Sequence, residues 1–158
     1  MRRVPMTPEG YRQLEEELTY IREVARPKVV QDIEEARAHG DLSENSEYDD
    51  AKHRQGLIEG RFLEVKAKIA AAEIIDIAKI EPSDRVIFGV TVEIEDVDTE
   101  AVSTYRIVGT DEADIKKGLI SVTSPIARAL IGKEEGDEVE VNTPGGKRTL
   151  VINEVQYK

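Results

Sequence analysis

Cysteine and tryptophan are absent from this 158-residue sequence, and aromatic residues make up only 4% of it. Without cysteine, the chain has no disulfide framework, no thiolate metal site and no thiol nucleophile. No stretch reaches the roughly 20 apolar residues that span a bilayer, and no apolar run follows the N-terminal arginines as it would in a secretion signal. These absences predict a cytoplasmic protein without a membrane partner.

Positive charge is also scarce, since the sequence contains 22 basic and 33 acidic residues and has a formal net charge of -11. Residues 1–75 contain 12 basic and 16 acidic side chains, so the excess of acid is not confined to one half of the chain. Generic binding to nucleic acid needs clustered Lys and Arg facing the phosphates. Any contact with nucleic acid must therefore be local.

Hydrophobic residues in the first half recur at the alternating spacings of three and four that are typical of coiled coils. Thr7 before Pro8 predicts the start of a helix, with threonine as the N-cap. Two such seams, separated by a break at residues 39–43, bury best against each other and predict an antiparallel coiled-coil hairpin over residues 1–76. The first seam comprises Tyr11, Leu14, Leu18, Ile21, Ala25, Val29, Ile33 and Ala36, and the second Tyr48, Ala51, Gln55, Ile58, Phe62, Val65, Ile69 and Ala72.

The break between the seams has its own turn signals. Gly40 can end the first helix, and Ser43, Asn45 or Ser46 can cap the second. Pro27 interrupts the first helix, where it removes a backbone hydrogen bond and predicts a kink.

The helical spacing of apolar residues ends after Ile74. Residues 77–83 are predicted to form a linker to a second domain over residues 84–158. Segments rich in Val, Ile, Thr and Tyr predict four or five antiparallel strands there, and Ser124-Pro125 opens one short helix that Gly132 ends. The fold class is therefore α+β. The predicted strands span residues 86–94, 103–108, 137–142 and 147–157.

Acidic residues crowd the turn of the hairpin, here named the acidic tip (residues 40–47), and the start of the second helix. Like charges this close repel, which favours a cation or a basic partner that completes the cluster. The alternative is a solvated turn whose first-turn acids favour the helix dipole, and the two readings are balanced. Asp41 and Glu44 lie in the turn itself, where their carboxylates can point along the hairpin axis, so they are the better functional candidates. The cluster comprises Asp41, Glu44, Glu47, Asp49 and Asp50.

The stretch ARAHGDLSENSEYDDAK at residues 36–52 closely resembles the tip motif of the bacterial transcript-cleavage factors of the Gre family. Three further segments resemble family motifs in family order: TPEGYRQLEEEL at 7–18, SVTSPIARALIGKEEGD at 121–137 and TPGG at 143–146. The sequences FGVTV and YRIVG are most similar to those of the A-type members. Agreement at four separate places covers essentially the whole chain.

The resemblance implies a transcription elongation factor that is not itself an enzyme and has no cofactor of its own. The hairpin would enter the secondary channel of bacterial RNA polymerase, and an FKBP-like C-terminal domain would dock at the rim of the channel. Asp41 and Glu44 would help to hold the second Mg²⁺ of the polymerase and orient a water that cleaves backtracked RNA near its 3′ end. One copy of the chain would act as a monomer.

Basic residues near the acidic tip would contact the extruded RNA by the family pattern, and the alternative is ordinary surface pairing with Glu34, Asp49 or Asp50. The resemblance also implies polymerase contact by a second group of residues, which can at the same time form a helix start. His39 and His53 flank the tip, and exposure without a role is the favoured reading. The RNA-contact candidates are Arg37, Lys52 and Arg54, and the polymerase-contact candidates are Ser124, Pro125 and Ile126.

Two other functions are alternatives to this one. An FKBP-like prolyl isomerase or chaperone with a helical arm needs an aromatic-lined pocket, yet residues 84–158 contain only Phe88, Tyr105 and Tyr157. A Gre-like relative that occupies the channel without promoting cleavage is disfavoured because Asp41 and Glu44 are both present.

Overall fold

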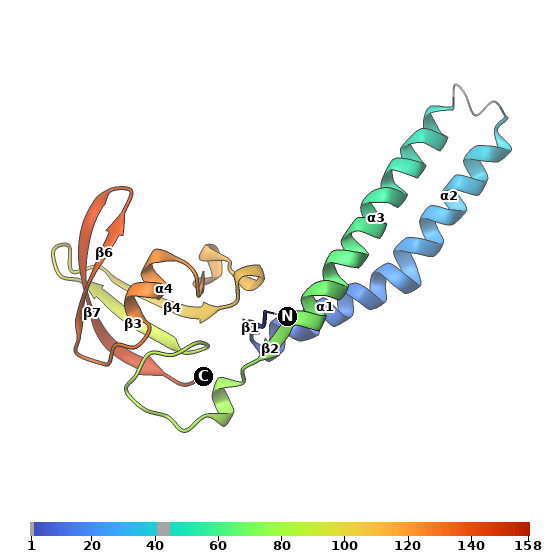
Figure 1. The fold of residues 1–158 in the computed structure, drawn as a ribbon. Coiled ribbons are helices and arrows are strands. Elements are labelled where there is room, and N and C mark those ends of the chain that lie inside the picture. Colours follow the sequence, from blue (N-terminus) through green and yellow to red (C-terminus); the bar gives the residue numbers. More distant parts are fainter. Residues whose placement is uncertain (1, 41–44) are drawn as a thin grey trace. The chain divides into compact units, whose positions relative to one another are not determined.

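The computed structural model describes residues 2–40 and 45–158 (Figure 1). Contacts divide the chain into two units, of which the first contains Tyr11–Ala72 and the second combines Arg3–Gly10 with Glu73–Lys158. The first unit is helical, and the second is built on a curled sheet. The predicted α+β class with an N-terminal helical hairpin is confirmed. Within the described residues, no helix is long and apolar enough to cross a membrane.

The hairpin consists of α1 (Pro8–Tyr20), a π-helical turn (Ile21–Ala25), α2 (Arg26–Ala38) and α3 (Ser46–Ala71). Every residue of the two predicted seams is buried or half-buried, whereas most residues between them are exposed. The heptad reading is therefore confirmed along both helices.

The interruption predicted at Pro27 takes the form of the π-helical turn. The Arg26 N–H donates to the Ile21 carbonyl, five residues back, and Pro27 then lies in the first turn of α2. A proline in a first turn loses no intrahelical hydrogen bond. Figure 1 shows the helix changing direction between α1 and α2, as predicted.

The hairpin begins at the predicted cap. The Thr7 hydroxyl accepts a hydrogen bond from the Gly10 N–H at 3.1 Å, and Thr7 is only 1% exposed. Ahead of it, the short strand β1 (Val4–Met6) pairs with β2 (Ala72–Ile74) in a separate two-stranded sheet. The sequence did not predict either strand.

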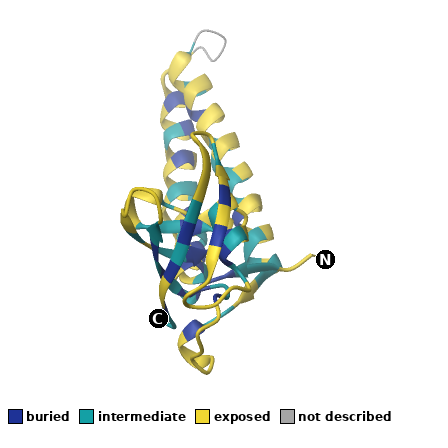
Figure 2. Cartoon of the chain, turned by 90° about the vertical axis from the view of Figure 1, so that its left-hand side faces the viewer, coloured by how far each residue is buried: buried dark blue, intermediate teal, exposed yellow. Residues whose placement is uncertain are grey.

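The second unit contains β3 (Thr91–Asp96), β4 (Val102–Val108), β5 (Leu119–Ser121), β6 (Glu138–Thr143) and β7 (Gly146–Gln156) in the order β5-β4-β3-β7-β6. Buried residues alternate with half-buried ones along most of β3 and with exposed ones along most of β6. Figure 2 shows the residues of this unit coloured by burial. The short helix α4 (Pro125–Leu130) has the predicted cap, since the Ser124 hydroxyl accepts from the Ala127 N–H at 3.2 Å. Ala127 and Leu130 bring this helix into the core.

Two strand predictions need correction. The strand predicted over residues 86–94 begins only at Thr91, because the chain turns at Gly89, where φ is +91°. The sheet is also not fully antiparallel, since β5 pairs parallel to β4. The connection between these strands is a crossover with two 3₁₀ turns, Thr110–Glu112 and Ile115–Lys117, and not a tight hairpin.

Candidate functional site

Asp41 and Glu44, the predicted catalytic residues, lie outside the described residues. The structure describes the chain on both sides of them, through Gly40 and again from Asn45. Gly40 has φ +109°, a conformation that favours glycine and that agrees with its predicted place at the end of the first helix.

Asn45 is the residue that caps α3. Its Oδ1 accepts a hydrogen bond from the Tyr48 N–H at 3.1 Å, which satisfies one of the free donors at the helix start. Its Nδ2 donates to the Ala36 carbonyl at 2.6 Å, in the last turn of α2. One half-buried amide therefore joins the end of α2 to the beginning of α3.

A second contact spans the same ends on the surface. His39 Nδ1 and Glu47 Oε2 lie 2.9 Å apart, and their side chains are 62% and 68% exposed. His39 is exposed, as expected, but it has a partner. At this exposure an ion pair contributes little to stability.

The three basic candidates near the acidic tip have different surroundings. Arg54 contacts Asp32 at 3.0 Å and Asp50 at 3.4 Å, so two carboxylates balance its charge. Hydrogen bonding to Lys28, and next to Arg54, lowers the pKa of Asp32. Lys52 donates to the neutral Gln55 amide at 3.2 Å, and the Arg37 guanidinium lies 5.9 Å from the centre of the Tyr48 ring.

Two arginines fix the register of the hairpin. Arg26 makes two hydrogen bonds of 2.7 Å to Glu59, and its guanidinium stacks 3.8 Å from the centre of the Phe62 ring. Arg61 makes the equivalent paired contact with Glu17 at 2.6 and 2.7 Å. The first pair joins α2 to α3 and the second joins α1 to α3. Such paired geometry fixes orientation.

We expect these pairs to make the hairpin sensitive to acid. Hydrogen bonding to Arg61 lowers the pKa of Glu17 from its ordinary 4.5, so the stabilisation is present above that value and is lost as pH falls through the lower folded-state pKa. In circular-dichroism melts, the melting temperature should fall below about pH 4.5. The Arg61→Met variant should have a lower melting temperature than the parent chain at neutral pH. Its melting temperature should also fall by less on acidification. Equal acid sensitivity of the two proteins would contradict this expectation.

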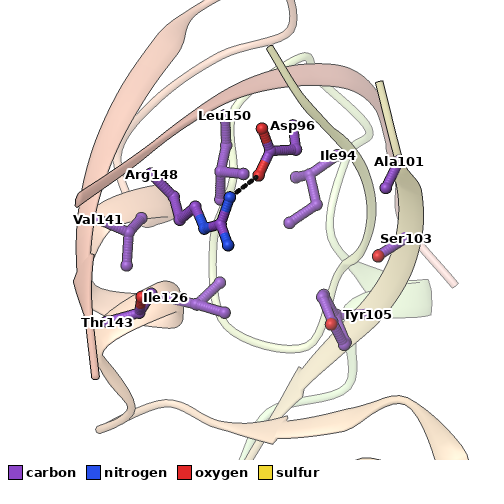
Figure 3. A pocket seen from close by; sticks show the side chains of 10 residues that line it. All are labelled: Ile94, Asp96, Ala101, Ser103, Tyr105, Ile126, Val141, Thr143, Arg148 and Leu150. Carbon is purple, nitrogen blue, oxygen red and sulfur yellow. Dashed lines mark ion pairs between the residues drawn. The ribbon is translucent and has the colours of Figure 1, made fainter. Parts of the chain in front are cut away.

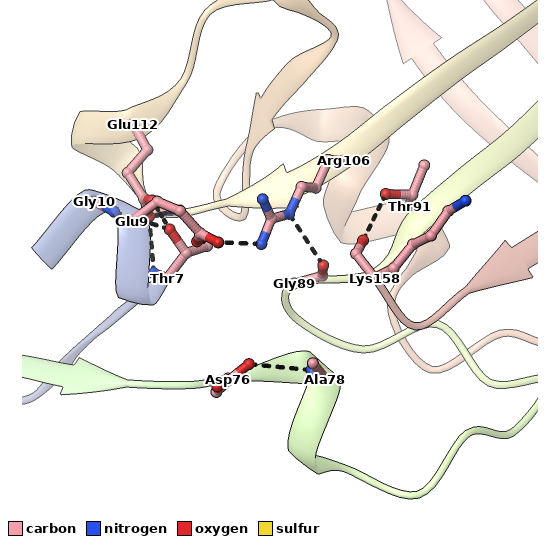
Figure 4. Close-up of polar contacts among 11 residues, drawn as sticks. Thr7, Glu9, Gly10, Asp76, Ala78, Gly89, Thr91, Arg106, Glu112 and Lys158 are labelled. Carbon is pink, nitrogen blue, oxygen red and sulfur yellow. Dashed lines mark hydrogen bonds and ion pairs between the residues drawn. The ribbon is translucent and has the colours of Figure 1, made fainter. Parts of the chain in front are cut away.

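The start of α1 is held inside the second unit (Figure 4). The Glu112 carboxylate accepts hydrogen bonds from the Thr7 N–H at 3.1 Å, from the Thr7 hydroxyl and from the Gly109 N–H at 2.8 Å. Glu9 lies 3.6 Å from Arg106. The pKa of Glu9 is lowered, chiefly by a backbone hydrogen bond at the helix start and less by Arg106.

Gly10→Ala should destabilise the chain, although alanine usually stabilises a helix by about 1 kcal/mol over glycine. A methyl group at Gly10 would collide with the Glu112 carboxylate, and moving that carboxylate breaks its hydrogen bonds to Thr7 and Gly109 at a cost of about 1–3 kcal/mol. Gly56→Ala is the matched control, because nothing lies within 4 Å of the added methyl group, and it should raise stability. Thermal melts that rank both variants alike would contradict this reading of Gly10.

A second candidate site is a pocket in the second unit that Ile126 lines (Figure 3). Its volume is about 150 Å³, and its wall is mostly apolar, with Tyr105 as one aromatic member. The Asp96 and Arg148 side chains, paired at 3.6 Å, form a charged part of the lining. A cavity of this size accepts one apolar side chain. The other lining residues are Ile94, Ala101, Ser103, Val141, Thr143 and Leu150.

The acidic residues Asp96, Asp98 and Glu100 lie at the hairpin turn between β3 and β4, where the Asp96 carboxylate accepts from the Asp98 N–H at 2.9 Å. In the part of the chain that the structure describes, no group of His, Cys, Asp or Glu side chains is placed to hold a metal ion.

Comparison with known proteins gives matches over both units. Two family models match, "Transcription elongation factor, N-terminal" at residues 4–74 and "Transcription elongation factor, GreA/GreB, C-term" at residues 81–157. The chain is 56% identical to the transcription elongation factor GreA of Methylococcus capsulatus over 99% of both chains, and 57% identical to that of Hyphomonas neptunium over 100% of both. A solved structure of GreA factor homolog 1 (Gfh1) from Thermus thermophilus is 27% identical over 98% of this chain and 99% of that one, with a TM-score of 0.44.

Proposed function

Because the chain belongs to the GreA/GreB family of transcription elongation factors, we propose that Asp41 and Glu44 act inside the active centre of bacterial RNA polymerase. The protein is an accessory factor and not itself an enzyme, and it stimulates the polymerase's own cleavage of backtracked RNA. The hairpin enters through the secondary channel as a single copy, and the acidic tip reaches the nascent RNA 3′ end. The observation that carries this proposal is the match to GreA factors along the whole chain.

The role of the two carboxylates follows from the needs of phosphodiester hydrolysis. In a two-metal site, Mg²⁺ supplies charge stabilisation and an activated water. Asp41 and Glu44 would add anionic oxygen ligands to an ion held by the polymerase and would orient the attacking water by hydrogen bonding. Mg²⁺ prefers about six oxygen ligands, which two carboxylates do not supply, so the polymerase would have to hold the metal.

The basic residues near the acidic tip differ in how available they are to contact RNA. Among the residues that the structure describes, Arg37 and Lys52 contact neutral groups, which leaves their charge available for RNA phosphates. Arg54 already faces two carboxylates, so a contact with RNA would require it to leave Asp32 and Asp50. We therefore assign RNA contact first to Arg37 and Lys52, and to Arg54 only as a further member.

The polymerase docks on the second unit around Ser124, Pro125 and Ile126. Ser124 and Pro125 start α4, and Ile126 faces the apolar pocket, so a side chain inserted into the pocket would contact this segment. An apolar anchor in a pocket with a charged edge is typical of the energetic centre of a protein interface.

The test is transcript cleavage in a stalled, backtracked polymerase complex supplied with Mg²⁺. Addition of the chain should release short RNA fragments that contain the 3′ end, and the chain without polymerase should release none. Binding without fragments would favour the channel-occupying alternative, and failure to bind would favour an isomerase or chaperone. Either result would overturn the proposal.

A further inference from the structure

The two helix ends beside residues 41–44 each leave backbone groups without intrahelical partners. At the end of α2, the His39 N–H donates to the Ala36 carbonyl at 3.2 Å. Asn45 Nδ2 is a second donor to that carbonyl, from across the turn. Its Oδ1 accepts from the Tyr48 N–H, one of the first N–H groups of α3, which have no intrahelical acceptor. The cross-helix bond, at 2.6 Å, is the shorter of the two.

Capping alone does not call for an amide at this position. Asp and Ser cap helices about as well as Asn, and Asp would also favour the helix dipole. Neither side chain can reproduce both bonds, since a carboxylate has no donor and a serine hydroxyl is too short to serve Tyr48 and Ala36 together. Capping α3 therefore needs only the acceptor of Asn45, whereas the link to α2 also needs its amide donor.

We propose that Asn45 is a positioning residue for transcript cleavage, because its amide fixes the end of α2 against the start of α3 next to Asp41 and Glu44. This inference rests on the role proposed for those carboxylates. Four residues, 41–44, connect Gly40 to Asn45, so a shift between the helix ends displaces the anchors of that segment. A displacement of about 1 Å at reacting groups can reduce a rate 10²-fold. The exposed His39–Glu47 pair is too weak to replace the amide link.

The test compares Asn45→Ser and Asn45→Asp in full-length protein with backtracked polymerase complexes. Both variants keep an N-cap acceptor and lose the donor to Ala36. The cleavage rate at saturating factor should fall about 10- to 100-fold. The concentration that gives half-maximal cleavage and the melting temperature should stay near those of the parent chain. Agreement between the neutral Ser variant and the charged Asp variant assigns the loss to the missing donor and not to added charge.

His39→Gln is the matched control, since it removes the neighbouring ion pair to Glu47 and leaves Asn45 intact, and it should keep most of the rate. Full cleavage by both Asn45 variants, while Asp41→Asn and Glu44→Gln are inactive, would overturn the positioning role alone. Full cleavage by Asp41→Asn and Glu44→Gln would instead overturn the proposed catalytic residues. A parallel loss of melting temperature and binding affinity in the Asn45 variants would make Asn45 a stability residue and also refute the inference.

Discussion

Asp41→Asn and Glu44→Gln should each reduce stimulated cleavage by at least about 10- to 100-fold, towards the rate of polymerase alone. Each change keeps the size of the side chain but removes the negative charge that a Mg²⁺ ligand needs. Binding to polymerase should be unchanged, because docking is assigned to the second unit. The measurement is the rate of fragment release as a function of factor concentration, in which the maximum falls and the half-saturating concentration stays constant.

Asp49→Asn provides the control for these variants. Asp49 lies in the first turn of α3 and is exposed, where an acid favours the helix dipole. This variant removes the same charge a few residues away and should retain most of the stimulation. If Asp49→Asn were as inactive as Asp41→Asn, the tip would act through its total charge, and the assignment of Asp41 and Glu44 as individual ligands would be wrong.

The hairpin could be predicted because its signals are local and repeated. The spacing of apolar residues marks both seams, Thr7 and Gly40 mark the ends of the first helical run, and Ser124 marks α4 in the same way. Each signal depends on residues within one or two helical turns. Pro27 is also a local signal, although a proline alone predicts a kink and does not indicate that a π-helical turn will accommodate it.

Features that depend on distant residues could not be predicted. Glu112 receives hydrogen bonds from Thr7, 105 residues earlier, and Arg54 pairs with Asp32, 22 residues earlier. The strands β1, β2 and β5 have three residues each, too few to show an alternating pattern. Their positions follow from the partners that they find in the folded chain.

In the candidate site, too, features with local sequence signals could be predicted, and features that depend on distant residues could not. Asp41 and Glu44 could be singled out because the sequence places them in the break between two recognisable helical seams. Asn45 was one of three equally plausible caps, and its bond to Ala36 depends on how the ends of α2 and α3 face each other. Asp96 and Arg148 come from different strands, so their pairing beside Ile126 depends on the register of β3 and β7.

Ile126→Glu should weaken binding to polymerase by about 2–4 kcal/mol, which corresponds to roughly 30- to 1,000-fold in affinity. A carboxylate in the apolar pocket opposes insertion of an apolar side chain from the polymerase. The cleavage rate at saturating factor should be retained, because the acidic tip is unchanged. Titration of factor into stalled complexes measures both quantities, and the expected result is the reverse of that for Asp41→Asn.

Ile126 also packs against the core, so Ile126→Glu alone could act through unfolding. Ala101→Tyr avoids this problem, since Ala101 is exposed at the pocket and a larger side chain there obstructs entry without replacing a core residue. Ile115→Glu is the control, because Ile115 is 67% exposed and is not among the residues that line the pocket. Weakened binding by Ala101→Tyr, but not by Ile115→Glu, would locate docking at the pocket. Equal affinity of all three variants and the parent chain would show that the polymerase binds elsewhere on the second unit.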